Sequence, residues 1–267
     1  MTIKFKQDEV FEVSHKKTGN PESNIIIFTS AKGGSGCSFL ASTVAEYMAQ
    51  RTTLNVLFLD MNIGRMDSRI IFGIDGPAVK DLGDLPERID NLDTLSLKKL
   101  IVNQKDSLNI ILPPLNMECP PILKNTNLDI LIESLRDHFD IICIDMPGYL
   151  LGQIDMAEID ISDRIVFVSL PDLFSVSNIR ILMDYVKDYR SCYDFYLVIN
   201  KYNMRSSISS TGLSNILRYP ITSFIPYDRD IEELVNTRGP GHIFKYKLKV
   251  VRNISGLAEK IFKGLEV

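Results

Sequence analysis

The sequence lacks several features that would assign it to a specialised class of protein. It has four cysteines in 267 residues and no C-x-x-C pair. A chain of this length can bury a core without disulfides, so we expect neither a disulfide framework nor a cysteine-bound metal. No apolar run is long enough to span a bilayer, and residues 1–21 lack the apolar segment of a secretory signal. A cytoplasmic, reducing compartment is therefore predicted.

An excess of positive charge is also missing. The formal net charge is −4, which argues against a uniformly basic coat, so nucleic acid is not an expected partner. The composition, 45% hydrophobic and 24% charged, is that of an ordinary globular protein. Repeats and low-complexity tracts are absent, so the simplest division is a polar extension over 1–23 followed by a single domain over 24–267.

Apolar runs of strand length alternate with amphipathic runs of helix length. This alternation predicts an α/β fold, with βαβ units on a mostly parallel, twisted sheet flanked by helices on both faces. The expected strands are nearly continuous in Ile, Val, Leu or Phe, as strands covered on both faces are. They are Asn24–Thr29, Leu54–Asp60, Leu108–Leu112, Asp140–Asp145, Arg164–Ser169, Phe195–Asn200 and Ile221–Ile225.

Amphipathic faces predict the helices. Crossover helices are expected over Ser38–Gln50, Asn127–His138 and Ser175–Tyr189. The apolar face of Val250–Leu265 has two interpretations, a membrane-targeting helix or, more commonly for such a face, a helix packed on its own domain. A basic stripe precedes it, which is either a contact for anionic phosphates or a solvated surface; its residues are Lys245, Lys247, Lys249 and Arg252.

A glycine-rich loop joins the first expected strand to the first expected helix. Glycines in such a loop let successive backbone N–H groups face an anion, and the N-terminus of the following helix adds its dipole. A hydroxyl at Ser38 can hold Mg²⁺. The loop predicts a phosphate site made of Lys32, Gly33, Gly34, Ser35, Gly36, Cys37 and Ser38.

The ordinary Walker A pattern would place a lysine at Cys37. Here a lysine precedes the glycine pair instead, and the string K-G-G-x-G-x-[ST] resembles the deviant Walker A family of ParA and MinD ATPases. The resemblance implies a P-loop NTPase fold, ATP and Mg²⁺ as cofactors, and a homodimer that sandwiches two ATP molecules. It also implies that Lys32 reaches the nucleotide held by the partner subunit.

Two further strand ends are similar to the family's acidic motifs. In Leu57–Gly64, Asp60 matches the first acid, and Asn62 stands where a water-orienting aspartate is usual. An amide cannot act as a base, although it can position water. Asp140–Gly148 resembles the Walker B strand and switch II. The resemblance thus assigns Lys32 and Asn62 to catalysis, and the metal to Ser38, Asp60 and Asp145.

Two downstream segments look like the parts of the family that hold the adenine ring. Val198–Tyr202 contains a strand-end asparagine, Asn200, which the resemblance places against the base. Phe224–Asp228 is similar to the segment that closes the other side of the base, through Pro226 and Asp228.

Within the family, loss of the loop lysine at Cys37 with retention of Lys32 looks like the CpaE and TadZ branch. That branch implies a protein that positions type IV or Flp pilus or secretion machinery at a cell pole, with those machines as partners and a peripheral contact with the membrane. Phosphoryl transfer needs charge neutralisation and an aligned water. The residues at 37 and 62 therefore predict slow ATP hydrolysis, with ATP acting as a dimer switch.

Three alternatives stay open. One is a chromosome or plasmid partition ATPase, and another is a non-hydrolysing scaffold with a degenerate ATP site. The third is a reductase similar to the nitrogenase iron protein, whose cluster needs exposed cysteines. Cys119 and Cys143 are the candidates for that cluster, but Cys143 lies inside an expected strand and should be buried.

Overall fold

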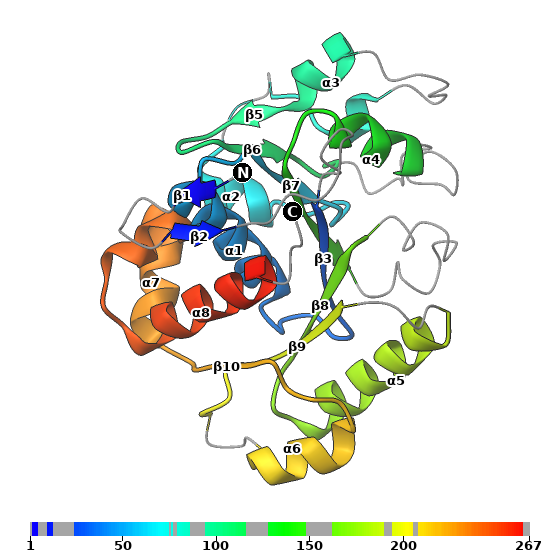
Figure 1. Cartoon of the computed structure of the whole chain (residues 1–267), viewed down its shortest axis with the longest axis vertical. Helices are drawn as coiled ribbons and strands as arrows, with labels where there is room; N and C mark the ends of the chain where they lie inside the picture. Colours follow the sequence, from blue (N-terminus) through cyan, green and yellow to red (C-terminus); the bar gives the residue numbers. More distant parts are fainter. Residues whose placement is uncertain are drawn as a thin grey trace.

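A computed structural model describes residues 2–4, 10–12, 24–74, 76, 79–85, 94–115, 128–147, 162–189, 194–204 and 208–263. One large sheet runs through the molecule with helices on both of its faces (Figure 1). A separate antiparallel pair, β1 (Thr2–Lys4) and β2 (Val10–Glu12), lies near the N-terminus.

The large sheet has eight strands in the order β10-β9-β8-β3-β7-β4-β6-β5. Every neighbouring pair is parallel except β5 and β6. The seven expected strands are confirmed, with ends that shift by at most two residues, whereas the short edge strand β5 was not expected. In chain order they are β3 (Asn24–Ser30), β4 (Val56–Asp60), β5 (Val102–Asn103), β6 (Leu108–Ile111), β7 (Ile141–Pro147), β8 (Arg164–Ser169), β9 (Asp194–Asn200) and β10 (Ser223–Ile225).

Alternate residues of each strand face opposite layers of helices, which gives the protein two cores. In β3, Ile26 and Phe28 face one core, while Ile25 and Ile27 face the other. The first core includes α1 (Cys37–Arg51), α7 (Arg229–Arg238) and α8 (Lys249–Lys263). The second includes α3 (Thr94–Leu100), α4 (Leu128–Arg136), α5 (Leu173–Tyr189) and α6 (Ser210–Leu217). Burial on both sides explains why the central strands are continuously apolar.

Three short helical elements complete the described chain. The helix α2 (Asp67–Phe72) follows β4, a 3₁₀ turn η1 covers Leu82–Asp84, and a second 3₁₀ segment, η5 (Pro240–Lys245), connects α7 to α8.

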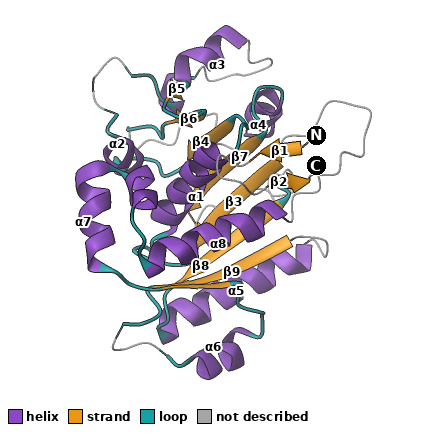
Figure 2. Ribbon diagram, turned by 60° about the vertical axis from the view of Figure 1, so that its left-hand side comes forward, coloured by secondary structure: helices purple, strands orange, loops and turns teal. Residues whose placement is uncertain are grey.

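The C-terminal helix α8 packs on its own domain. Its apolar side chains are buried, and the helix lies beside α1 across one face of the sheet (Figure 2). The membrane-targeting interpretation of this face is therefore wrong for the described residues, because a face that fills the core has no apolar surface left for lipid. No helix in the described residues combines the length and hydropathy needed to cross a bilayer.

The parallel arrangement brings the carboxyl ends of the strands to one edge of the sheet, where open α/β sheets hold their ligands. At this edge β3 leads through the glycine loop into α1, β4 ends in Asp60, and β9 ends in Asn200. The glycine loop, the acidic residues and the base-side segments predicted from sequence therefore meet in one region.

Candidate functional site

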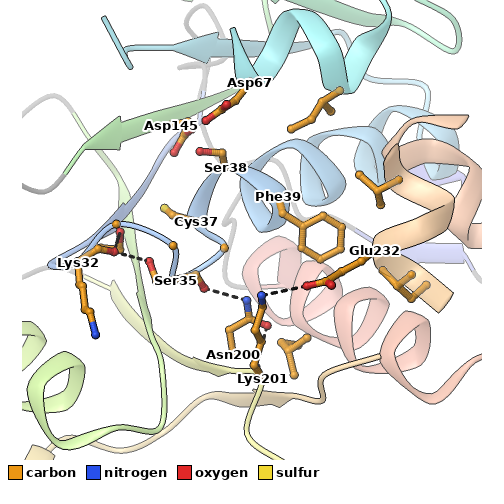
Figure 3. Close-up of a pocket in the computed structure, with 18 of the residues that line it drawn as sticks. Lys32, Ser35, Cys37, Ser38, Phe39, Asp67, Asp145, Asn200, Lys201 and Glu232 are labelled. Atoms are coloured by element: carbon orange, nitrogen blue, oxygen red, sulfur yellow. Dashed lines mark hydrogen bonds and ion pairs between the residues drawn. The ribbon is translucent and has the colours of Figure 1, made fainter. Parts of the chain in front are cut away.

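A cavity of about 720 Å³ opens at this edge of the sheet. Of the predicted site residues, Asp60 alone does not line it. Those that do line it are Lys32, Gly33, Gly34, Ser35, Gly36, Cys37, Ser38, Asn62, Asp145, Asn200, Pro226 and Asp228. Ser38 and Asp145 mark one end of the cavity, and Asn200, Lys201 and Glu232 mark the other (Figure 3).

The glycine loop has the geometry of an anion cradle. Gly34 and Gly36 have φ of 79° and 82°, in the left-handed region that favours glycine. Gly36 precedes the 15-residue helix α1, and no side chain caps the N-terminus of that helix. The first N–H groups of a helix need partners, and its dipole favours negative charge at this end. A phosphate in the cavity meets both requirements.

Lys32 does not point into this cradle. Its side chain extends away from Ser38 and Asp145 (Figure 3) and is 45% exposed, with Nζ 3.7 Å from Asp172 Oδ1. Asp172 precedes α5 and also accepts hydrogen bonds from the backbone and hydroxyl of Ser175. The lysine therefore presents its charge at the rim of the cavity.

Two buried carboxylates lie side by side behind the loop. Asp60 and Asp145 are register partners in β4 and β7 and are 1% and 2% exposed. The amide of Asn62 bridges them, because its Nδ2 donates to Asp60 Oδ1 and to Asp145 Oδ2, each at 2.7 Å. Burial raises the pKa of Asp145 to about 7, with the charge of Asp60 adding to the effect, and burial also raises the pKa of Asp60.

Cys37 begins α1 next to this pair. Its side chain is buried, and burial raises the pKa of the thiol well above its usual value, with the charge of Asp145 acting in the same direction. A thiol with a raised pKa stays neutral and is a poor nucleophile. Cys37 therefore contributes no positive charge where the ordinary Walker A loop has a lysine.

The metal end of the cavity fits Mg²⁺. Neither Asp60 nor Asp145 has an ion-pair partner among the described residues, and Asp60 Oδ2 is buried without a hydrogen-bond partner there. Ser38 lies near Asp145, and Asp67, which sequence reasoning missed, lies beside them (Figure 3). No group of three or more His, Cys, Asp or Glu in the described residues forms a metal cage. Mg²⁺ does not need a cage of this kind, since it binds through one or two carboxylates together with phosphate and water.

The structure qualifies one predicted metal ligand. Asp60 lies behind Asn62 and does not line the cavity, so it acts on the metal end through Asn62 and Asp145. Gly148 of the predicted switch II lies outside the described residues, as does Cys119. Cys143 is fully buried in β7, as predicted, so it cannot serve as an exposed cluster ligand.

The opposite end of the cavity, called the base end because the sequence predicts a base there, is built from β9, β10 and α7. Lys201 Nζ lies 3.1 Å from Glu232 Oε1, and the side chain of Asn203 pairs with both the N–H and the carbonyl of Tyr227. Asp228, predicted to face the base, also caps α7 by accepting from the Asp230 N–H at 3.0 Å. Lys201 and Tyr227 lie within the two segments predicted from sequence but were not named as site residues, and Glu232 was missed because it reaches the cavity only through the packing of α7.

The sequence matches no family model. It is nevertheless similar to known nucleotide-binding proteins of the MinD and ParA kind. The septum site-determining protein MinD of Thermotoga maritima is 22% identical over 245 residues, which cover 89% of this chain and 88% of that protein. A ParA family ATPase from Chlorobium tepidum has a TM-score of 0.74 at 22% identity, covering 89% of this chain and 99% of that one. The fold is that of MinD and ParA.

Another solved protein with this fold is a MinD in complex with Mg-ADP. This protein, from Pyrococcus horikoshii, has a TM-score of 0.72 at 18% identity and covers 92% of this chain and 99% of its own. The MinD-like fold confirms the predicted P-loop NTPase architecture, and in that relative it holds a magnesium nucleotide.

Proposed function

We propose that this chain is a MinD/ParA-type ATPase that binds Mg·ATP in the cavity and dimerises around it. The observation that carries the proposal is the uncapped N-terminus of α1, which meets the left-handed Gly36 beside two buried carboxylates without an ion-pair partner among the described residues. One end of the cavity is suited to phosphate and Mg²⁺, and the other provides a partly apolar wall for a base. Similarity to MinD along most of the chain supports the same function.

The dimer follows from the position of Lys32. Its charge lies at the cavity rim and points away from the metal end, so it would leave its ion pair with Asp172 to contact phosphate oxygens presented by a second copy. Charge of this kind on a transferring phosphoryl group is the main means by which proteins stabilise its transition state. Two copies facing each other would each supply Lys32 to the other.

Slow hydrolysis follows from Cys37 and Asn62. When bound, Mg²⁺ would neutralise phosphate charge at Ser38 and Asp145. Cys37 adds no positive charge there, and both N–H groups of the Asn62 amide are used on the two carboxylates. Asn62 has no basic group with which to activate water. The nucleotide would therefore act mainly as a dimer switch.

The cellular role that we propose is the positioning of a cell-surface machine, a type IV or Flp pilus or a secretion apparatus, at a cell pole. Two sequence features support it, and both are similar to the CpaE and TadZ branch. Cys37 occurs together with a retained Lys32, and residues 59–64 have the sequence Leu-Asp-Met-Asn-Ile-Gly. We expect a cytoplasmic protein whose peripheral contact with the membrane comes through its partners, because α8 is buried in its own domain.

Binding and dimerisation are tested on the purified chain. A fluorescent ATP analogue should bind in the presence of Mg²⁺, and light scattering should show dimers with ATP and monomers with ADP. Lys32→Ala should abolish the ATP-dependent dimer, whereas Lys105→Ala, an exposed lysine between β5 and β6, should leave it intact. Saturating Mg·ATP that neither binds nor changes the mass would overturn the proposal.

The cellular role is tested by deleting the gene. Loss of surface pili or of secretion, with normal cell division and chromosome inheritance, is the expected outcome. Misplaced septa would instead indicate a division role of the kind named for MinD, and loss of plasmids or chromosomes would indicate partition.

A further inference from the structure

A second hollow, a groove of about 440 Å³, is lined by α8 and by the edge strand β10, which lies beside it (Figure 1). It shares no lining residue with the cavity of the candidate site. The residues that α8 contributes are spaced by three or four positions, so they lie on one face of the helix. The lining residues are Ser223, Lys249, Arg252, Asn253, Gly256 and Lys260.

The groove gathers positive charge that no carboxylate balances. Three of its lining residues are cationic and none is acidic, in a chain whose net charge is −4. None of the three cations has an ion-pair partner among the described residues. Glu259, the one acid of α8, accepts a hydrogen bond from the Tyr47 hydroxyl at 2.8 Å instead. A local concentration of positive charge of this kind attracts an anion.

Two of the cations are held in place while keeping donors for a ligand. Lys260 Nζ donates to the Thr222 carbonyl at 2.6 Å, and Lys249 Nζ lies 3.3 Å from the Tyr202 hydroxyl. An ammonium group has three N–H donors, so neither contact exhausts it. The guanidinium of Arg252 makes no hydrogen bond or ion pair in the part of the chain that the structure describes. It can therefore pair with two oxygens of one phosphate group.

Gly256 leaves the middle of the groove open. It lies one helical turn from Arg252 and one from Lys260, and a Cβ added to it would meet no atom within 4 Å. Glycine in a helix interior costs stability relative to alanine, and here the neighbouring packing does not require it. The missing side chain gives a ligand access to the helix between two cations.

We propose that this groove binds a phosphate monoester dianion, carried either by a free phosphorylated metabolite or by the headgroup of an anionic lipid. Guanidinium and ammonium donors are the usual partners of phosphate, and a doubly charged group suits three clustered cations. Of the basic stripe predicted from sequence, Lys249 and Arg252 belong to the groove, whereas Lys245 and Lys247 lie outside it. A lipid would be reached through this charged face of α8, since the apolar face is buried.

The test uses the full chain with Mg·ADP in excess, so that phosphate bound at the glycine loop does not contribute. Calorimetry with glycerol phosphate tests the free source, and flotation with phosphatidylcholine vesicles that contain phosphatidic acid tests the lipid source. Binding of either probe supports the site and identifies the source. Arg252→Glu should weaken that binding by roughly tenfold or more. Lys247→Glu makes the same change of charge outside the groove and should weaken it by less than about threefold.

A further variant tests the groove without altering its charge. Gly256→Leu fills the open space and should also weaken binding by roughly tenfold. Its thermal midpoint should not fall, because leucine is a better helix former than glycine. If Arg252→Glu fails to fold, Arg252→Ala takes its place. A wild type that binds neither probe would overturn the proposal. Unchanged binding in Gly256→Leu, or equal losses in Arg252→Glu and Lys247→Glu, would do so too, since either would show a diffuse charged surface of the kind that meets nucleic acid.

Discussion

The side-chain amide of Asn62 donates a hydrogen bond to Asp145 at 2.7 Å. It also donates to Asp60 at the same distance, so one neutral side chain hydrogen-bonds to two buried acids. An aspartate at this position would place a third carboxylate against them. An amide at position 62 therefore stabilises the two buried acids when no cation is bound. Unlike a carboxylate, it cannot act as a base to activate water.

Replacing Asn62 with aspartate should destabilise the metal-free protein. The variant removes two hydrogen bonds and adds a repelling charge, so we expect the free energy of unfolding at pH 8 to fall by about 2 kcal/mol or more. Urea denaturation with EDTA measures the change, and saturating Mg·ATP should recover most of it. Asn178→Asp, which adds the same charge on an exposed site of α5, should change stability by less than about 0.5 kcal/mol. Equal effects of the two variants would contradict the bridging role.

Stability without metal should fall as the pH rises. Burial raises the pKa of Asp145 to about 7, so the folded protein keeps a proton that the unfolded chain releases near pH 4. The stabilisation is complete below about pH 4 and is lost as the pH approaches about 7, by on the order of 4 kcal/mol. Urea denaturation in EDTA from pH 5 to pH 8 measures the slope. Asp145→Asn should flatten it, and a slope that the variant leaves unchanged would place the titrating group elsewhere.

A half-buried acid outside the cavity allows a further prediction. Glu46 lies in α1 against Gly241, and burial raises its pKa to about 7. Because its charged form is disfavoured by burial, Glu46→Gln should stabilise the protein by roughly 1 kcal/mol at pH 8 and have little effect at pH 5. The measurement is the urea midpoint at the two pH values. Glu233→Gln, on the exposed side of α7, serves as the control and should show no difference between them.

Replacing Cys37 with lysine should speed hydrolysis. The introduced ammonium group would bring positive charge to the phosphates and could pair with Asp145 when the cavity is empty, so we expect turnover to rise by about tenfold or more. A phosphate-release assay measures the rate. Cys37→Met tests the effect of length without charge and should not increase it. Turnover in Cys37→Lys no faster than in Cys37→Met would mean that charge at this position does not limit the reaction.

The sheet could be predicted from sequence because strands buried on both faces carry a continuous apolar signal. Arg164–Ser169 agrees residue for residue with the structure. The edge strand Val102–Asn103 is too short to give such a signal. The glycine loop between β3 and α1 could be located from sequence because its pattern lies in consecutive residues.

The remainder of the site depends on long-range packing. Glu232 enters through α7, and the contact between Asn200 and Ser35 joins distant parts of the chain. No local sequence pattern predicts the place of Glu232 at the cavity or the contact between Asn200 and Ser35. The position of Asp60 behind Asn62 likewise follows from the pairing of β4 with β7.

The contact between α8 and α1 has a consequence for synthesis of the protein on the ribosome. α1 (residues 37–51) is synthesised long before α8 (residues 249–263), which packs against it. In a nascent chain, the part of α1 that α8 covers stays exposed until residues 249–263 have left the exit tunnel. Chaperone demand should therefore persist until these residues emerge.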